Sequence, residues 1–103
     1  MGASKKQFFP NNQNKTATLC KAMAHPARVA IIEHLTTVHR CIGDEFLEIV
    51  PLSQSSISRH ISELLTAGLI SSSFENNAYT YEITPAALHM MGSYFSKMAN
   101  KFS

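Results

Sequence analysis

The chain has little cysteine, little charge and no long apolar segment, and each shortage excludes a class of protein. Two cysteines among 103 residues are too few for the disulfide framework of a small secreted domain, and their scarcity fits a reducing compartment. No apolar run approaches the ~18 residues that a membrane span requires. The lysines near the N-terminus are not followed by the apolar segment of a signal peptide. We therefore expect a cytoplasmic protein with no membrane partner.

Glycine is also scarce, with four in all, which leaves no glycine-rich phosphate loop. No serine has the flanking residues of a nucleophile elbow. We therefore expect no enzyme, no catalytic residue and no cofactor. Nine Lys and Arg against seven Asp and Glu give a net charge of +2, which permits nucleic-acid binding without requiring it.

What is present is enough apolar sequence for one folded domain. Hydrophobic residues make up 45% of the chain and charged residues 16%, a balance typical of a globular protein. Residues 1–12 are polar and turn-rich, apart from Phe8 and Phe9, and we expect a flexible N-terminal arm there. Residues 13–103 are expected to form the domain.

The first half of this domain has apolar residues at helical spacing in segments 14–24, 26–38 and 44–50. Pro26 suits the first turn of the second segment, where a missing N–H is not needed. Pro51 ends the third segment because the residue before a proline is steered away from helical geometry. The side chains expected to face inward from that third segment are Phe46, Leu47 and Val50.

Ser53 is a suitable N-cap for a fourth helix that extends to Ala67, and Gly68 is suited to end it in a left-handed conformation. Segments 69–74 and 79–83 then predict a β-hairpin. Thr84 and Pro85 begin a last helix. The order predicts a mostly α domain with a small β-hairpin wing, a winged helix-turn-helix (α-α-α-α-β-β-α).

The helix of residues 53–67 has two distinct faces. Ile57, Ile61, Leu64 and Leu65 share one face and anchor it to the core. The other face has short hydrogen-bonding side chains and Arg59, which suit contact with base edges. An ordinary solvated face is the alternative, although such a face is usually richer in Lys and Glu.

Three segments resemble ArsR-type (arsenical-repressor-like) winged-helix regulators. Residues 21–32, KAMAHPARVAII, resemble the opening motif of that family. Residues 52–61, LSQSSISRHI, resemble its recognition helix, and residues 64–70, LLTAGLI, resemble the segment that leads into the wing. The resemblance extends over residues 15–102. It implies a bacterial transcriptional repressor that binds a palindromic operator in double-stranded DNA as a homodimer. The recognition helix, residues 53–67, would lie in the major groove.

The residues expected to contact DNA are Ser53, Gln54, Ser55, Ser56, Ser58, Arg59 and His60, with Asn76 and Asn77 at the wing tip. A plain hairpin turn is the alternative for the two asparagines, since the wing lacks the basic residues often found in the family. Phosphate contacts are therefore also expected from Lys21, Arg28, Arg40 and the N-terminal lysines.

In the family the first and last helices form the dimer interface. The last helix of this chain has a wide apolar stripe, more than a short domain needs for its own core. Packing on its own subunit alone is the alternative. The expected interface residues are Leu19, Met23, Met91, Tyr94, Phe95, Met98 and Phe102.

The inducing signal has no clear motif. Metal-sensing members of the family carry a Cys-Val-Cys pair, but here Cys41 is followed by Gly43 at the second position. The last helix offers only His89, and the five histidines have no repeated ligand spacing. We therefore expect no metal.

Cys20 and Cys41 are candidates for a thiol switch, with two buried small hydrophobes as the alternative. Because the net positive charge is small, a second function is also possible: the winged helix could be a protein-interaction adaptor without sequence-specific DNA binding.

Overall fold

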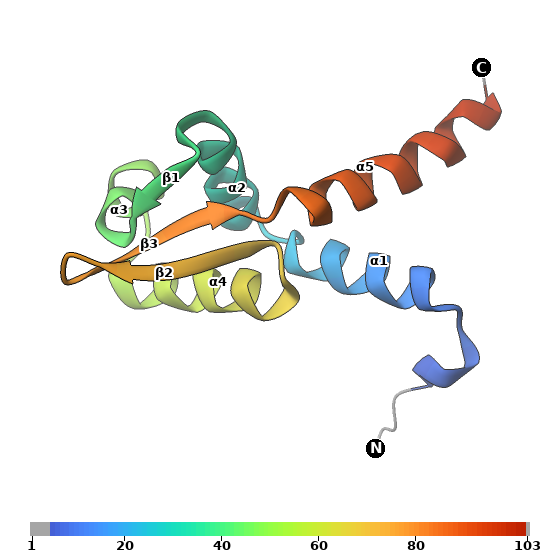
Figure 1. Ribbon diagram of the computed structural model, residues 1–103, viewed down its shortest axis with the longest axis horizontal. Coiled ribbons are helices and arrows are strands. Elements are labelled where there is room, and N and C mark those ends of the chain that lie inside the picture. Colours follow the sequence, from blue (N-terminus) through green and yellow to red (C-terminus); the bar gives the residue numbers. More distant parts are fainter. Residues whose placement is uncertain (1–4, 103) are drawn as a thin grey trace.

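The computed structural model describes residues 5–102 (Figure 1). It is mostly helical with a three-stranded sheet. The elements are η1 (Lys6–Phe8), α1 (Asn11–Ala22), α2 (Pro26–Val38), β1 (Arg40–Ile42), η2 (Gly43–Glu45), α3 (Phe46–Ile49), α4 (Gln54–Ala67), β2 (Ile70–Glu75), β3 (Ala78–Ile83), α5 (Pro85–Ala99) and η3 (Asn100–Phe102). The predicted mostly α winged helix-turn-helix is confirmed.

Local side chains define the ends of α4. The Ser53 hydroxyl accepts a hydrogen bond from the Ser56 backbone N–H at 3.2 Å, so Ser53 is the N-cap. At the other end Gly68 has φ +82°, a left-handed conformation that side chains with a Cβ rarely adopt. The helix that the sequence predicted from Ser53 to Ala67 is confirmed, with both of its terminal signals.

The sheet has the order β1-β3-β2, with both neighbouring pairs antiparallel. Asn76 and Asn77 form the two-residue loop of the β2–β3 hairpin, and their φ angles are +51° and +61°. Positive φ at both loop residues is the geometry of a type I′ turn, which matches the twist of the flanking strands. The wing tip is therefore a tight turn for which asparagine is well suited.

The core is built from buried residues of the helices α1 to α5 together with Cys41 and Ile70 of the sheet. Its largest fully buried side chains are Phe46, Leu19, Ile31, Leu35, Leu64 and Leu69. α4 packs against β2, and α2 packs against β3. From this body α1 and α5 leave on the same side and diverge toward the two termini, while the β2–β3 turn lies on the opposite side (Figure 1).

Several predicted boundaries were wrong. α1 begins at Asn11, directly after Pro10, so the polar segment expected through residue 12 is partly helical. The third helix divides into η2 and a four-residue α3, and Leu47 is 42% exposed, whereas Phe46 and Val50 are buried as expected. β1 was not predicted. Residues 1–4 of the expected arm lie outside the described residues.

Among residues 5–102, no helix combines the length and the apolar character needed to cross a bilayer.

Candidate DNA-binding surface

α4 presents a polar surface because its apolar side chains are used in the core. Ile57, Ile61 and Leu64 are buried, and Leu65 is half-buried. The residues that this packing leaves exposed are Gln54, Ser55, Ser58, Arg59, Ser62, Glu63 and Thr66. The predicted division of the helix into two faces is confirmed by this burial.

The serines at the start of α4 differ in their surroundings. The Ser53 hydroxyl lies 3.1 Å from the Ser56 hydroxyl and 3.2 Å from the Ser55 hydroxyl, in addition to its capping hydrogen bond. Ser56 is half-buried, whereas Ser55 and Ser58 are exposed. Ser53 therefore has a structural role of its own, and Ser55 and Ser58 are the serines placed to contact a ligand.

His60 faces the interior, not the exposed side of α4. Its ring is buried and lies 4.3 Å from the ring of His25, measured between centroids. Its Nδ1 accepts a hydrogen bond of 3.0 Å from Nε of Arg28. Burial, then the neighbouring His25 and Arg28, lower the pKa of His60. The expectation that His60 contacts DNA is not supported by this packing.

Two of the cations expected to contact phosphate are engaged within the chain. Arg28 is half-buried and donates to His60 and to the Ala22 carbonyl. Arg40 forms ion pairs with Glu82 at 2.8 Å and Glu75 at 3.6 Å, which raise its pKa. Glu82 and Glu75 compensate the charge of Arg40, and the guanidinium of Arg28 keeps its charge but is engaged by two hydrogen bonds within the chain. The exposed cations that we consider for DNA contact are therefore Arg59 on α4 and Lys21 at the end of α1.

The wing and the start of α4 are brought together by the fold. A groove of about 340 Å³ lies between them, and its wall includes Gln54 and Ser58 from α4 and Asn77 from the wing tip. Asp44 and Tyr79 also line it. Residues that the sequence placed in one site from two separate segments thus share one surface.

The residues expected at a dimer interface fall into three groups by burial. Leu19 and Met91 are buried within this one chain and belong to its core, so they do not form an exposed surface. Met23 and Tyr94 are half-buried. The exposed members are Phe95 at 46%, Met98 at 43% and Phe102 at 90% exposure.

Cys20 is half-buried and Cys41 is buried, and both are free thiols. Burial, followed by the charge of Glu45, raises the pKa of Cys41 to about 11. Since the thiolate is the reactive form, this environment disfavours Cys41 as a thiol switch.

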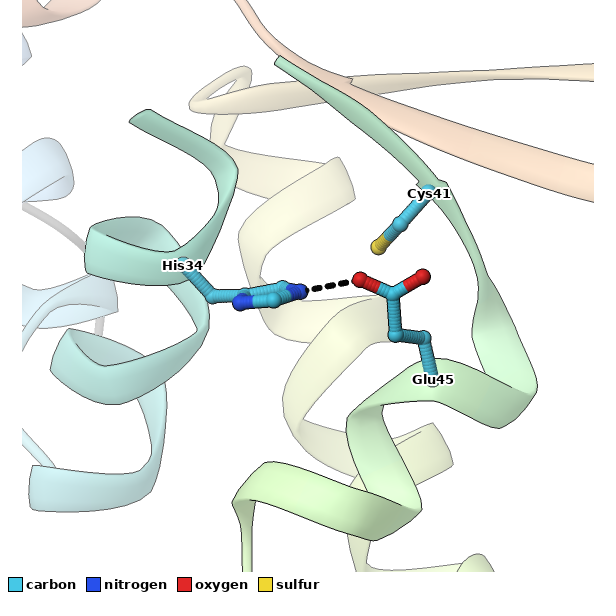
Figure 2. Close-up of side chains that lie close together, drawn as sticks. All are labelled: His34, Cys41 and Glu45. Atoms are coloured by element: carbon cyan, nitrogen blue, oxygen red, sulfur yellow. Dashed lines mark hydrogen bonds and ion pairs between the residues drawn. The ribbon is translucent and has the colours of Figure 1, made fainter. Parts of the chain in front are cut away.

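One constellation was missed by the sequence reasoning. His34, Cys41 and Glu45 converge from α2, β1 and η2, with their ligand atoms within 4.8 Å of one another (Figure 2). Spacings of seven and four residues would place them on one face of a continuous helix, but the three residues lie on three separate elements, so the spacing gives no indication of this cluster. Only knowledge of β1 and η2 would have revealed the cluster.

No family model matches the sequence. The chain is 32% identical over 75 residues to the HTH-type transcriptional regulator YgaV of Escherichia coli, an alignment that covers 73% of this chain and 76% of YgaV. Its fold matches an ArsR-like transcriptional regulator from Rhodococcus sp. RHA1 with a TM-score of 0.77 at 17% identity, over 90% of this chain and 87% of that one. The chain belongs to the ArsR-type family of winged helix-turn-helix transcriptional regulators.

A second relative is Rv0081, an uncharacterized HTH-type transcriptional regulator of Mycobacterium tuberculosis. The sequence match is 34% over 67 residues and covers 65% of this chain but only 59% of Rv0081. The crystal structure of Rv0081 superposes with a TM-score of 0.66 at 27% identity, over 87% of this chain and 92% of that one. The family resemblance inferred from the three sequence segments is thereby confirmed, and with it the predicted class of protein, a transcriptional regulator.

Proposed function

We propose that this ArsR-type chain binds double-stranded DNA as a homodimer and represses transcription from a palindromic operator. The observation that carries this proposal is the exposed N-terminal half of α4, with Gln54, Ser55, Ser58 and Arg59 beside the wing. In this proposal the protein catalyses no reaction. It acts in the cytoplasm, where the operator DNA is.

Each of these side chains has a suitable partner on a base pair. The Gln54 amide can donate to and accept from an adenine edge, and the Arg59 guanidinium can donate to the O6 and N7 of guanine. Short serines allow the helix backbone to approach the major groove closely. The backbone amides at the start of α4 favour a phosphate nearby, and Lys21 adds a cation.

The homodimer is supported by α5. Phe95 and Met98 are large apolar side chains exposed on a helix that extends away from the body (Figure 1). A second copy of α5 against them would bury both sets by one two-fold operation. Two-fold symmetry would also place two copies of α4 about one turn of DNA apart, which is the geometry that a palindrome requires.

A protein-interaction adaptor is the second candidate. It is favoured by the ion pairs of Arg40 with Glu82 and Glu75 and by the internal hydrogen bonds of Arg28, which leave fewer cationic side chains available for phosphate. An adaptor would still dimerise, but it would prefer no DNA sequence.

Selection of bound duplexes from a random DNA pool separates the two candidates. We expect enrichment of one inverted repeat with half-sites about 10 base pairs apart, and the affinity for it should fall steeply with salt. Enrichment of no sequence, or of a single half-site without a repeat, would contradict the proposed homodimeric repressor.

A further inference from the structure

His34, Cys41 and Glu45 form a cluster of metal-ligating side chains away from the DNA-binding surface. His34 Nε2 lies 2.5 Å from Glu45 Oε2, and the Cys41 sulfur lies beside this pair (Figure 2). Cys41 is buried, and the His34 and Glu45 side chains are 19% and 37% exposed. The three donors therefore lie close together, with the thiol enclosed and the imidazole and carboxylate partly open to solvent.

The surrounding packing holds each donor in place. Cys41 is at the centre of β1 and pairs with Tyr81 of β3. Glu45 precedes Phe46, which is fully buried and contacts two neighbours through its ring. The Phe46 ring centroid lies 6.2 Å from that of His34 and 6.0 Å from that of Tyr81. The backbone around the cluster is thus tied to the core from several sides.

We propose that His34, Cys41 and Glu45 bind one Zn²⁺ ion, with the fourth coordination position open to water. An imidazole nitrogen, a thiolate sulfur and a carboxylate oxygen are the three donor types that zinc takes from proteins, and three protein ligands with one open position is a known zinc arrangement. Donor atoms around a tetrahedral zinc lie roughly 3.3–3.8 Å apart, given zinc–ligand bonds of about 2.0–2.3 Å. The donor atoms here lie within 4.8 Å of one another, and His34 Nε2 and Glu45 Oε2, now 2.5 Å apart, would separate by about 1 Å to bind one zinc ion.

The charges also balance. A thiolate and a carboxylate carry two negative charges, which a divalent cation neutralises, and His34 binds as a neutral ring. Binding requires the Cys41 S–H bond to break, with its proton released to solvent as the Zn–S bond forms. The His34–Glu45 hydrogen bond is exchanged for one bond from each residue to the metal.

The expectation of no metal rested on a missing Cys-Val-Cys pair and on unrepeated histidine spacing. Neither observation tests a site that is assembled from α2, β1 and η2. A metal here would tie α2 to β1, an edge strand of the sheet, and to η2, which leads into α3. None of the three ligands lies on α4, so the zinc site and the DNA-binding surface can fail independently.

The test is a titration of the chelator-treated full chain with Co²⁺, followed by displacement with Zn²⁺. We expect one Co²⁺ per chain, a near-ultraviolet thiolate-to-cobalt charge-transfer band, and loss of that band on adding one equivalent of Zn²⁺. Absence of the band would overturn the proposal.

Substitution of each proposed ligand tests whether that residue binds the metal. Cys41→Ser should remove the charge-transfer band. His34→Gln and Glu45→Gln should each weaken Zn²⁺ binding more than about 100-fold in competition with a chromophoric chelator, beyond the 10–100-fold typical for loss of an outer-shell partner. The matched controls are Cys20→Ser, His39→Gln and Glu48→Gln, which should bind as wild type.

Thermal unfolding, monitored by circular dichroism, identifies the variants that do not fold. Because Glu45 is partly exposed, Glu45→Gln is expected to fold and keeps the test valid if Cys41→Ser does not. Wild-type Zn²⁺ affinity in folded Glu45→Gln, or loss of the band in Cys20→Ser, would contradict the proposed site.

Discussion

α4 and α5 are amphipathic helices of almost equal length, 14 and 15 residues, but their exposed faces differ in kind. α4 buries its apolar stripe in the core and exposes serines, a glutamine and an arginine. α5 buries only Met91 fully and leaves Phe95 and Met98 exposed. The polar face suits a hydrogen-bonding ligand such as DNA, and the apolar face suits another protein surface.

The two helices are therefore suited to different functions, α4 to DNA recognition and α5 to dimerisation. The body that contains α4 has its core complete within one chain, as the buried Phe46, Leu35 and Leu64 show. The end of α5 lacks comparable cover from residues 5–102 of the same chain. In our proposal a second copy supplies that cover, and DNA affinity depends on both helices.

The largest effect is expected from charge on the apolar face of α5. Phe95→Glu combined with Met98→Glu should convert the dimer to a monomer in sedimentation equilibrium, because the change would bury like charges across the two-fold axis. Loss of the second half-site contact should then lower operator affinity about 100-fold or more, since paired binding sites commonly gain 10²–10⁴ from linkage.

The control places the same charges on the opposite face of α5. At 100° per residue, Ser93 and Ser96 point away from the apolar stripe, so Ser93→Glu with Ser96→Glu should remain dimeric. A dimeric Phe95→Glu, Met98→Glu variant, or a monomeric control, would mean that α5 is not the interface.

The smallest expected effect is a pH dependence of stability caused by His60, on the buried side of α4. The lowered pKa of His60 means that the unfolded chain binds the proton more readily than the folded chain does. The stabilisation is therefore present in full above the unfolded pKa, near 6.5, and is lost as the pH falls below it toward the folded pKa. We expect the free energy of unfolding in urea to decrease between pH 7.5 and pH 5.

His60→Asn should flatten that pH dependence, because its amide oxygen can still accept from Arg28 but does not titrate. His89→Asn, at an exposed position on α5, is the control and should follow the wild type. Equal pH dependence in His60→Asn and wild type would show that the His25–His60–Arg28 contact does not govern acid stability.

Local signals in the sequence predicted α4 and the wing well. Ser53 and Gly68 define the helix ends, and the alternation of strand residues places the hairpin within one residue. These features depend on neighbours in the chain, so pattern reasoning reaches them. The same reasoning missed β1, because a three-residue strand has too few positions to show alternation and depends on pairing with β3.

The candidate site was predicted less completely because burial depends on tertiary contacts. His60 lies within a motif that resembles the family's recognition helix, yet it turns toward His25 and Arg28. Arg40 pairs with Glu82, its partner across the β1–β3 ladder, which no local pattern indicates. The His34, Cys41 and Glu45 cluster was invisible for the same reason.

The central claim, that the N-terminal half of α4 reads DNA sequence, is tested most directly by fluorescence anisotropy on the selected duplex and on a scrambled one. Arg59→Ala should lose about 10-fold or more in affinity for the selected duplex, since one good base contact contributes about 1–3 kcal/mol, and it should stay dimeric. Thr66→Ala, on the exposed face at the far end of α4, should bind as wild type. Wild-type preference for the selected duplex in both Arg59→Ala and Ser58→Ala would contradict the account.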